Sequence, residues 1–279
     1  MNNLPLMLYA DPNDPLIPSV QSCDGATLLH IDAILPYLTK SEWPIVLDLT
    51  LPGDIAKTFE NSTIINRIFN LSGTEIILKL REWGVAESWF NARLHRYLST
   101  AKRLIHDMGQ RGVSRCLQPL NTQWFRIVRE DSSIQTPIFS YAMSYEAPKL
   151  NGMRSPMQKS VWSIYDWREE LSISPYEKNR HRFFVDAPTG TPVIAYFFGE
   201  QIGFHFPKET INVDIEMYRR IIRAVHSVFM SEIGEILTYV EVNGTIRFYG
   251  FSPFLNSVRN CDDFEAMAES WATTLSSRH

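Results

Sequence analysis

The sequence predicts a protein of mixed α and β structure, in which an α/β N-terminal region precedes an antiparallel sheet packed with helices. Short apolar runs separated by turn or helix-start residues fill the segment before residue 72, which is typical of buried strands joined by helices. Strand-like runs then recur between residues 182 and 251. We place a first domain at 1–115 and a second at 116–279, because the pattern changes in a glycine-containing stretch near residue 115.

Composition narrows the function classes. The 279 residues are enough for about two domains. A net charge of −4 gives no broad basic face, so we expect no nucleic-acid partner. The three cysteines are scattered and follow no metal-binding spacing, which indicates a reducing compartment. The N-terminus does not resemble a signal peptide, and no apolar run approaches the ~18 residues of a membrane span. We therefore expect a cytoplasmic protein with no membrane partner.

The first domain combines short strands with helices. Apolar residues at three- and four-residue steps predict one long helix over Ala86–Met108. The predicted strands are Leu6–Ala10, Leu28–Ile31, Ile45–Thr50 and Ile64–Leu71, and the predicted connecting helices are Asp32–Leu38 and Asp54–Phe59.

The second domain begins with a helix over Trp124–Arg129, followed by an irregular lid over about 140–175 that contains a strand at Val161–Tyr165. A helix capped by Asp214 and ended by Gly234 precedes a hairpin whose Asn243-Gly244 turn favours type I′ geometry. A last helix ends the chain. The other predicted strands form a meander, Arg182–Val185, Pro192–Phe198 and Gln201–Phe206, which we expect in one sheet with the hairpin strands Ile236–Val242 and Thr245–Phe251.

Several segments resemble the ATP-grasp superfamily, nearest its RimK-like and microviridin-type peptide-ligase branch. Ile64-Ile65-Asn66-Arg67 resembles the branch's "v-x-N-R" strand. The stretch 180–206 resembles its "y-R-v-f-V-v-g-d-x-v-x-A" meander, and the hairpin with Ser252-Pro253 resembles its "G-x-x-y-v-l-E-v-N-P" close. The resemblance implies an ATP-grasp-like fold, ATP and Mg²⁺ as cofactors, and ligation of a carboxylate to an amine on a peptide or amino acid.

The chain departs from that pattern at the residues that would hold Mg-ATP. The closing motif places Gly250 at the metal-binding Glu and Ser252 at the Asn, and the upstream Asp falls near Thr238 or Tyr239. The family's lysine strand, glycine-rich phosphate loop and adenine hinge have no recognisable counterpart. We therefore expect ATP and Mg²⁺ to bind weakly or not at all, and we assign no catalytic residue.

The resemblance still suggests a small set of site residues. It places Arg182 and Lys159 on a nucleotide, with Arg182 at the meander arginine that faces the phosphates. Glu241 is the substitute metal ligand, although strand alternation turns it to the opposite face.

Two functions remain open. One is a divergent ATP-dependent carboxylate-amine ligase. The other is a catalytically inactive, ATP-grasp-like binding module, a pseudoenzyme, that recognises a peptide or protein. In the second, the aromatic residues Trp162, Tyr165 and Trp167 would form the contact surface, because Trp and Tyr often anchor interfaces.

Overall fold

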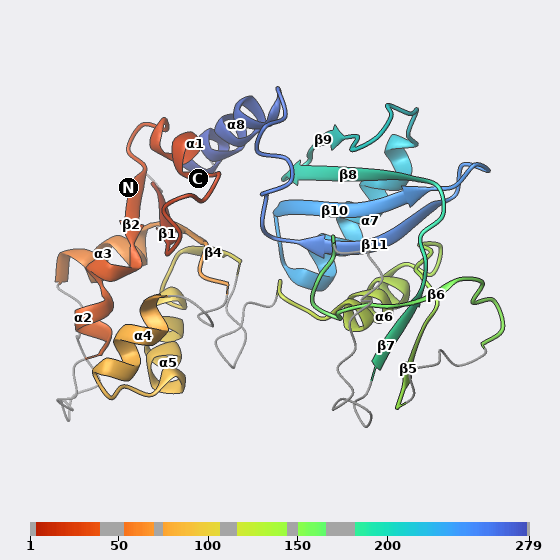
Figure 1. Ribbon diagram of the computed structural model, residues 1–279. Coiled ribbons are helices and arrows are strands. Elements are labelled where there is room, and N and C mark those ends of the chain that lie inside the picture. The colour runs from red at the N-terminus through yellow and green to blue at the C-terminus, as the bar shows by residue number, and fades with distance from the viewer. Residues whose placement is uncertain are drawn as a thin grey trace. The chain divides into compact units, whose positions relative to one another are not determined.

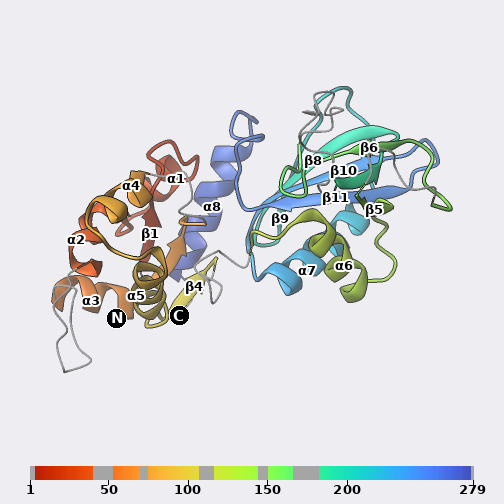
Figure 2. The same cartoon turned by 60° about the horizontal axis from the view of Figure 1, so that its bottom comes forward.

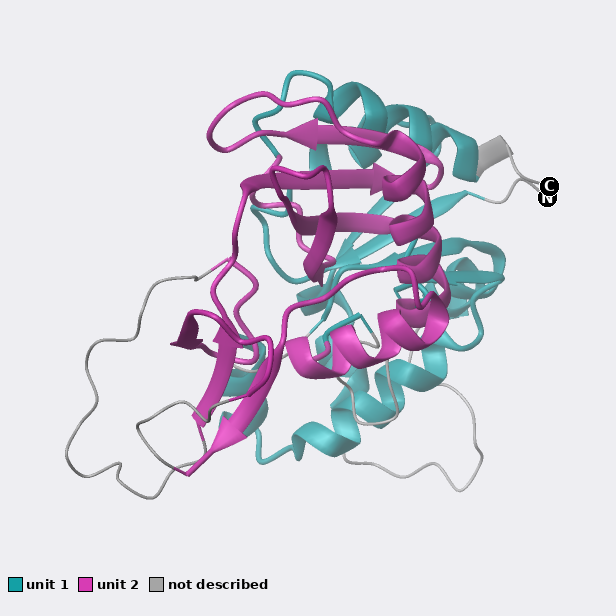
Figure 3. Ribbon diagram, turned by 90° about the vertical axis from the view of Figure 1, so that its right-hand side faces the viewer, with its two compact units in different colours: residues 1–117, 230–232, 259–279 teal, residues 118–229, 233–258 magenta. Residues whose placement is uncertain are grey.

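The structure, a computed structural model, describes residues 4–39, 53–69, 75–106, 116–143, 150–165 and 182–277. The chain divides into two compact units (Figure 3). Unit 1 comprises residues 1–117, 230–232 and 259–279, and unit 2 comprises residues 118–229 and 233–258. The end of the chain therefore belongs to unit 1, whereas the predicted second domain ran on to residue 279. The domain boundary itself stays a prediction.

Unit 1 contains a four-stranded parallel sheet in the order β2-β1-β3-β4 (Figure 1). Its strands β1 and β3 are almost wholly buried, as expected when helices cover both faces of a parallel sheet. This arrangement confirms the α/β prediction for the first region. The strands are β1 (Pro5–Tyr9), β2 (Thr27–His30), β3 (Thr63–Asn66) and β4 (Arg103–Ile105).

The helices of unit 1 correct one prediction. The long helix expected over Ala86–Met108 ends at Leu98, and residues 103–105 form β4, because this short apolar run pairs with β3. The expected strand Ile45–Thr50 lies outside the described residues. The helices are α1 (Ile17–Gln21), a 3-10 helix (Ile31–Ala33), α2 (Leu35–Leu38), α3 (Gly53–Asn61), α4 (Glu75–Glu82), α5 (Glu87–Leu98) and α8 (Phe264–Ser277).

Unit 2 is built on a four-stranded antiparallel sheet in the order β11-β10-β8-β9. Its strands are β8 (Thr191–Phe198), β9 (Gln201–His205), β10 (Ile233–Val240) and β11 (Ile246–Ser252). The predicted hairpin is confirmed as β10–β11, although β10 begins early enough to include Gly234, which we expected to end the preceding helix.

Helix α7 (Ile215–Phe229) covers one face of this sheet (Figure 2). The predicted cap is confirmed, because Asp214 Oδ1 accepts the backbone N–H groups of Glu216 and Met217 at 3.0 and 3.1 Å. The Tyr218 hydroxyl lies 2.6 Å from Thr238 Oγ1, which shows that Thr238 faces the helix.

A second sheet of unit 2 corrects the predicted meander. Its strands are β5 (Phe139–Ala142), β6 (Pro156–Gln158) and β7 (Arg182–Asp186), in the order β5-β7-β6. The run that begins at Arg182 therefore lies outside the hairpin's sheet, because the turn through Gly190 carries the chain from one sheet to the other. The expected strand Val161–Tyr165 is absent from the described residues, which form turns and bends there.

Helix α6 (Leu120–Glu130) covers the edge strand β11 and confirms the helix predicted over Trp124–Arg129. The Gln123 side chain accepts the Phe251 N–H at 2.8 Å and donates to the Phe251 carbonyl at 3.2 Å. Trp124 Nε1 donates to the Tyr249 carbonyl at 3.1 Å. These bonds pair backbone groups that an edge strand would otherwise expose. Ring stacking of Trp124 on Phe183, at 5.8 Å, connects α6 with the second sheet.

Candidate functional site

The candidate site is the face of the β10–β11 hairpin that points away from α7. Thr238 points toward α7, so the adjacent Leu237 points away from it. Leu237 is directly opposite Gly250 in the register, and Glu235 is opposite Ser252. The closing motif would place its metal ligands on this face.

Apolar side chains occupy the space beside Gly250. A Cβ atom at this position would lie 2.7 Å from Ile164 Cγ2 and 3.1 Å from Leu120 Cδ2. The backbone N–H of Leu120 donates to the Val161 carbonyl at 2.7 Å, which holds the segment 159–165 against the start of α6. The position at which the resemblance would place a metal-binding carboxylate is therefore next to apolar side-chain atoms.

Glu235 also holds the segment 159–165, through a hydrogen bond to Tyr165. Its carboxylate accepts the Ser257 N–H at 3.3 Å and the Ser257 hydroxyl at 3.2 Å, and it also bonds the Tyr165 hydroxyl. Burial and then the charge of Glu235 raise the pKa of Tyr165. Glu235 is only 1% exposed. Tyr165 is 39% exposed although its hydroxyl is bonded to Glu235, so this contact holds the segment 159–165 against the hairpin.

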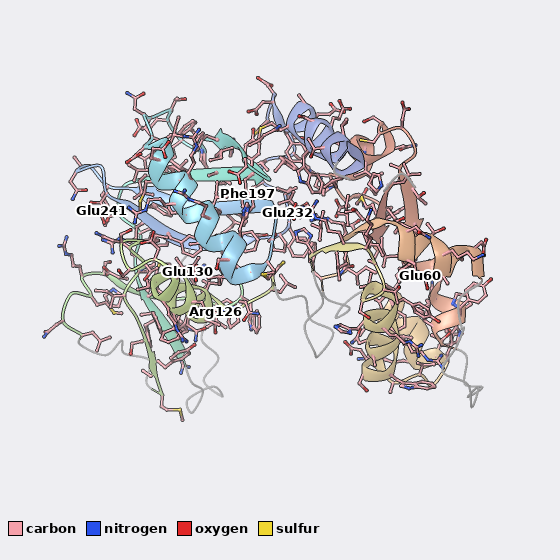
Figure 4. All side chains as sticks on the ribbon, turned by 180° about the vertical axis from the view of Figure 1, so that it is seen from behind. Glu60, Arg126, Glu130, Phe197, Glu232 and Glu241 are labelled. Carbon is pink, nitrogen blue, oxygen red and sulfur yellow. The ribbon has the colours of Figure 1, made fainter. Side chains whose placement is uncertain are left out.

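Glu241 lies at the far end of the hairpin, where Figure 4 labels it. It accepts hydrogen bonds from Arg247 Nη2 at 2.9 Å and Nε at 3.2 Å. Arg247 is the register partner of Tyr239, which shares a face with Leu237. Glu241 comes two positions after Tyr239, so alternation keeps it on this face and does not turn it away as expected.

The acidic residues of this face do not form one metal site. Glu235 and Glu241 are six positions apart on an extended strand, which corresponds to about 20 Å. Magnesium ligands lie about 2.1 Å from the ion, so these two carboxylates cannot share one. No group of three His, Cys, Asp or Glu side chains suited to a metal occurs among the described residues. The described residues of this face therefore do not supply the cluster of carboxylates that the resemblance would require of a Mg-ATP site.

The two predicted nucleotide ligands lie on or next to the second sheet. Arg182 begins β7, Lys159 follows β6, and both are 4% exposed. Arg182 therefore lies in a different sheet from the strands β8 and β9 of the predicted meander. A nucleotide role for Arg182 and Lys159 stays a prediction.

The three predicted aromatic contacts are not equivalent. Trp162 is 67% exposed, Tyr165 is tied to Glu235, and Trp167 lies outside the described residues. Of the two that the structure describes, Trp162 is the more exposed, since Tyr165 is 39% exposed.

Sequence analysis missed a cavity of about 240 Å³ beside Glu241. The Asn-Gly turn could have indicated part of it, since that turn brings Glu241 and Arg247 together across the hairpin. The remaining wall comes from the ends of β5 and β7 and from the loop before β6, which no local pattern connects. The cavity is lined by Pro137, Ile138, Gly152, Arg154, Asp186, Ala187, Thr189, Glu241, Arg247 and Tyr249.

Two buried tyrosines make the stability of unit 2 dependent on pH. Burial raises the pKa of Tyr218 and of Tyr249 well above the value of about 10 in an unfolded chain. Both hydroxyls stay protonated in the folded state, so their contribution is complete below pH 10 and is lost as pH rises above it. We expect the free energy of unfolding to fall by about 1.4 kcal/mol per pH unit for each tyrosine. Urea unfolding between pH 9 and 11 measures this slope. An unchanged slope after Tyr218→Phe and Tyr249→Phe would contradict the assignment.

Comparison with solved structures gives the fold. The chain resembles the macrocyclase MdnC from Microcystis aeruginosa, solved with the precursor peptide MdnA, at 11% identity and a TM-score of 0.63, over 99% of this chain and 100% of the other. A RiPP-associated ATP-grasp ligase from Chryseobacterium gregarium, solved with ADP and a leader and core peptide, gives 12% identity and a TM-score of 0.66 over 99% and 97% of the two chains. A RimK-domain ATP-grasp protein from Sphaerobacter thermophilus gives 11% and 0.54 over 98% of each.

Sequence comparisons give no match, either to a family model or to a curated protein. Within the described residues, no helix is long and apolar enough to cross a membrane. The structural likeness extends over nearly the whole of each chain. The chain therefore has the fold of the ATP-grasp ligases.

Proposed function

We propose that this chain is a peptide-binding protein with an ATP-grasp fold that does not turn over Mg-ATP. The observation that carries the proposal is the environment of Gly250, where Ile164 and Leu120 fill the place of a metal-binding carboxylate. Magnesium is held by oxygen ligands in near-octahedral geometry, and methyl groups provide none.

The neighbouring residues support the same proposal. Ser252 contributes a neutral hydroxyl, which accepts the Phe254 N–H at 3.1 Å. Glu235 already accepts hydrogen bonds from Ser257 and Tyr165. A metal ion beside Gly250 would have to displace Ile164.

A peptide is the partner that the solved relatives suggest, because MdnC and the Chryseobacterium ligase were both solved with peptides. Trp162 offers an exposed aromatic side chain next to the closed site. Tryptophan is enriched among the residues that dominate binding energy at interfaces. We assign Trp162 to peptide contact.

A divergent ATP-dependent ligase that joins a carboxylate to an amine on a peptide or amino acid is the second candidate. The buried cations Lys159 and Arg182 favour it, since an active enzyme of this fold needs positive charge on the nucleotide phosphates. In that case Glu241 would have to serve as the metal ligand.

The first experiment measures thermal stabilisation and phosphate release with Mg-ATP. A ligand that binds only the folded state raises its stability in proportion to the logarithm of concentration over Kd. We expect no rise in melting temperature and no phosphate release. Turnover that is lost in Lys159→Gln, Arg182→Gln or Glu241→Gln would establish the ligase instead.

The second experiment selects peptides from a displayed random library on the immobilised protein. We expect the selected peptides to lose at least tenfold in affinity for Trp162→Ala, a typical effect of removing an interface anchor. Trp83→Ala is the matched control, because Trp83 is also exposed and lies in unit 1. Failure to select any peptide, or equal binding to Trp162→Ala, would contradict peptide binding.

A further inference from the structure

The cavity beside Glu241 carries charges that the proposed function does not use. It has a volume of about 240 Å³, and all its lining residues belong to unit 2. Two acidic residues, Asp186 and Glu241, and two arginines, Arg154 and Arg247, line it, so its formal charge is zero. Small-molecule pockets are usually about 300 Å³ or larger, so this cavity suits a ligand of about one amino-acid residue.

In each of the two carboxylates, one oxygen accepts hydrogen bonds that hold the group in position. Asp186 Oδ1 accepts the backbone N–H groups of Arg154 at 2.8 Å and Ser155 at 2.7 Å. Glu241 Oε1 accepts hydrogen bonds from Arg247 and from the Thr189 hydroxyl. The other oxygens, Asp186 Oδ2 and Glu241 Oε2, accept no hydrogen bond from the part of the chain that the structure describes. These two oxygens are fixed acceptors for a donor in the cavity.

The two arginines differ in whether their side-chain donors are already bonded. Arg247 is engaged, since Nε and Nη2 donate to Glu241 and Nη1 donates to the Thr136 carbonyl at 3.2 Å. The exposed Arg154 side chain makes no hydrogen bond or ion pair with the described residues. The cavity thus offers carboxylate oxygens for a cation and a separate guanidinium for an anion.

Tyr249 places a hydroxyl among these charges. It is 2% exposed. Burial raises its pKa most, and the charges of Asp186 and Glu241 raise it further while Arg247 lowers it. Because this hydroxyl stays protonated at neutral pH, it adds a hydrogen-bonding group without adding charge. Pro137, Ile138 and Ala187 supply an apolar wall.

We propose that this cavity binds a free α-amino acid with an aliphatic side chain. The α-ammonium group lies against Asp186 and Glu241, the α-carboxylate against Arg154, and the side chain against the apolar wall. A simple anion is disfavoured by the two carboxylates, and a bare metal ion by the paired Arg247. A ligand that carries one positive and one negative group matches a lining whose opposite charges are separate and sum to zero.

Three matched probes separate the two charges in calorimetric titrations of the full chain: L-leucine, L-leucinamide and N-acetyl-L-leucine. The amide lacks the carboxylate, and the acetyl compound lacks the ammonium group. We expect L-leucine to bind and each blocked compound to bind at least tenfold more weakly. Failure of L-leucine to bind, or leucinamide binding as tightly as L-leucine, would overturn the proposal.

Substitutions then assign each charge to a residue. Arg154→Gln should weaken L-leucine at least tenfold and leave leucinamide unchanged. Asp186→Asn should weaken L-leucine and leucinamide alike, and its amide oxygen can still accept the N–H groups of Arg154 and Ser155. Arg129→Gln is the control, because Arg129 is an exposed arginine on α6, outside the cavity. Cooperative melting of each variant shows that it is folded, and unchanged L-leucine affinity in Arg154→Gln and Asp186→Asn overturns the site.

Three further outcomes separate this site from other assignments. Displacement of L-leucine by AMP, with AMP binding lost in Arg154→Gln, would assign the cavity to a nucleotide and overturn the proposal. Mg-ATP turnover in a protein that binds L-leucine with the expected selectivity would contradict only the proposed function. A protein that selects peptides through Trp162 and does not bind L-leucine would contradict only this site.

Discussion

Replacement of Gly190 by alanine is expected to destabilise unit 2 by about 3 kcal/mol or more. Gly190 has φ of +97°, and a Cβ atom there would lie 2.2 Å from the Val240 carbonyl oxygen and 2.7 Å from its carbon. Both are backbone atoms at the end of β10, so they cannot move without disturbing the hairpin. Gly190 also lies in the turn that leads from β7 in one sheet to β8 in the other. Urea unfolding of the variant measures the loss.

Gly244→Ala is the matched control for that experiment. Gly244 also has positive φ, +82°, but a Cβ atom there would meet nothing within 4 Å. Its replacement therefore costs only the backbone strain, about 1 kcal/mol. Equal losses at the two positions would show that the approach of Gly190 to Val240 is not as close as the structure has it.

Local chemistry was enough to predict much of the fold. The Asn243-Gly244 turn identified the hairpin, and the Asp214 cap identified the start of α7, because each depends on a few adjacent residues. Three of the four short apolar runs of the first region form the strands β1, β2 and β3, and the fourth, Ile45–Thr50, lies outside the described residues. These features do not require knowledge of what lies elsewhere in the chain.

Sheet membership was not predictable in the same way. β7 and β8 both have strand-like sequences separated by a short turn, and nothing local shows that they join different sheets. The run Leu104-Ile105 likewise fits a helix face or a short strand, and its pairing with β3 decides the outcome. In both cases the deciding contacts come from distant segments.

In the candidate site too, some features could be predicted from local sequence and others depend on distant contacts. At Gly250 and Ser252 the sequence departs from the residues that the resemblance would place at a metal site, and this difference can be read without the structure. The side chain that fills the gap, Ile164, comes from a stretch without periodicity, 86 positions before Gly250. Sequence patterns therefore lead to a prediction of missing metal ligands at this face, and only the three-dimensional packing shows which side chains lie beside Gly250.

The packing at Gly250 can be tested by a double-mutant cycle with Ile164. Gly250→Ala alone is expected to cost about 1–3 kcal/mol, because its Cβ would lie 2.7 Å from Ile164 Cγ2. Ile164→Ala alone is expected to cost about 2–4 kcal/mol, since Ile164 is buried and its loss leaves a cavity. In the double variant the new methyl group enters the space that Ile164 leaves. The combined loss should therefore be smaller than the sum by about 1 kcal/mol or more.

The control cycle pairs Gly250→Ala with Ile221→Ala. Ile221 is fully buried on α7, which packs on the other face of the sheet, so the two losses should add within about 0.5 kcal/mol. Additive losses for Gly250 and Ile164 would mean that Ile164 does not fill the place of the missing carboxylate. The observation on which the proposed loss of Mg-ATP chemistry depends would then fail. A coupling found only in the Ile164 cycle would show that the side chain of Ile164 occupies the space beside Gly250.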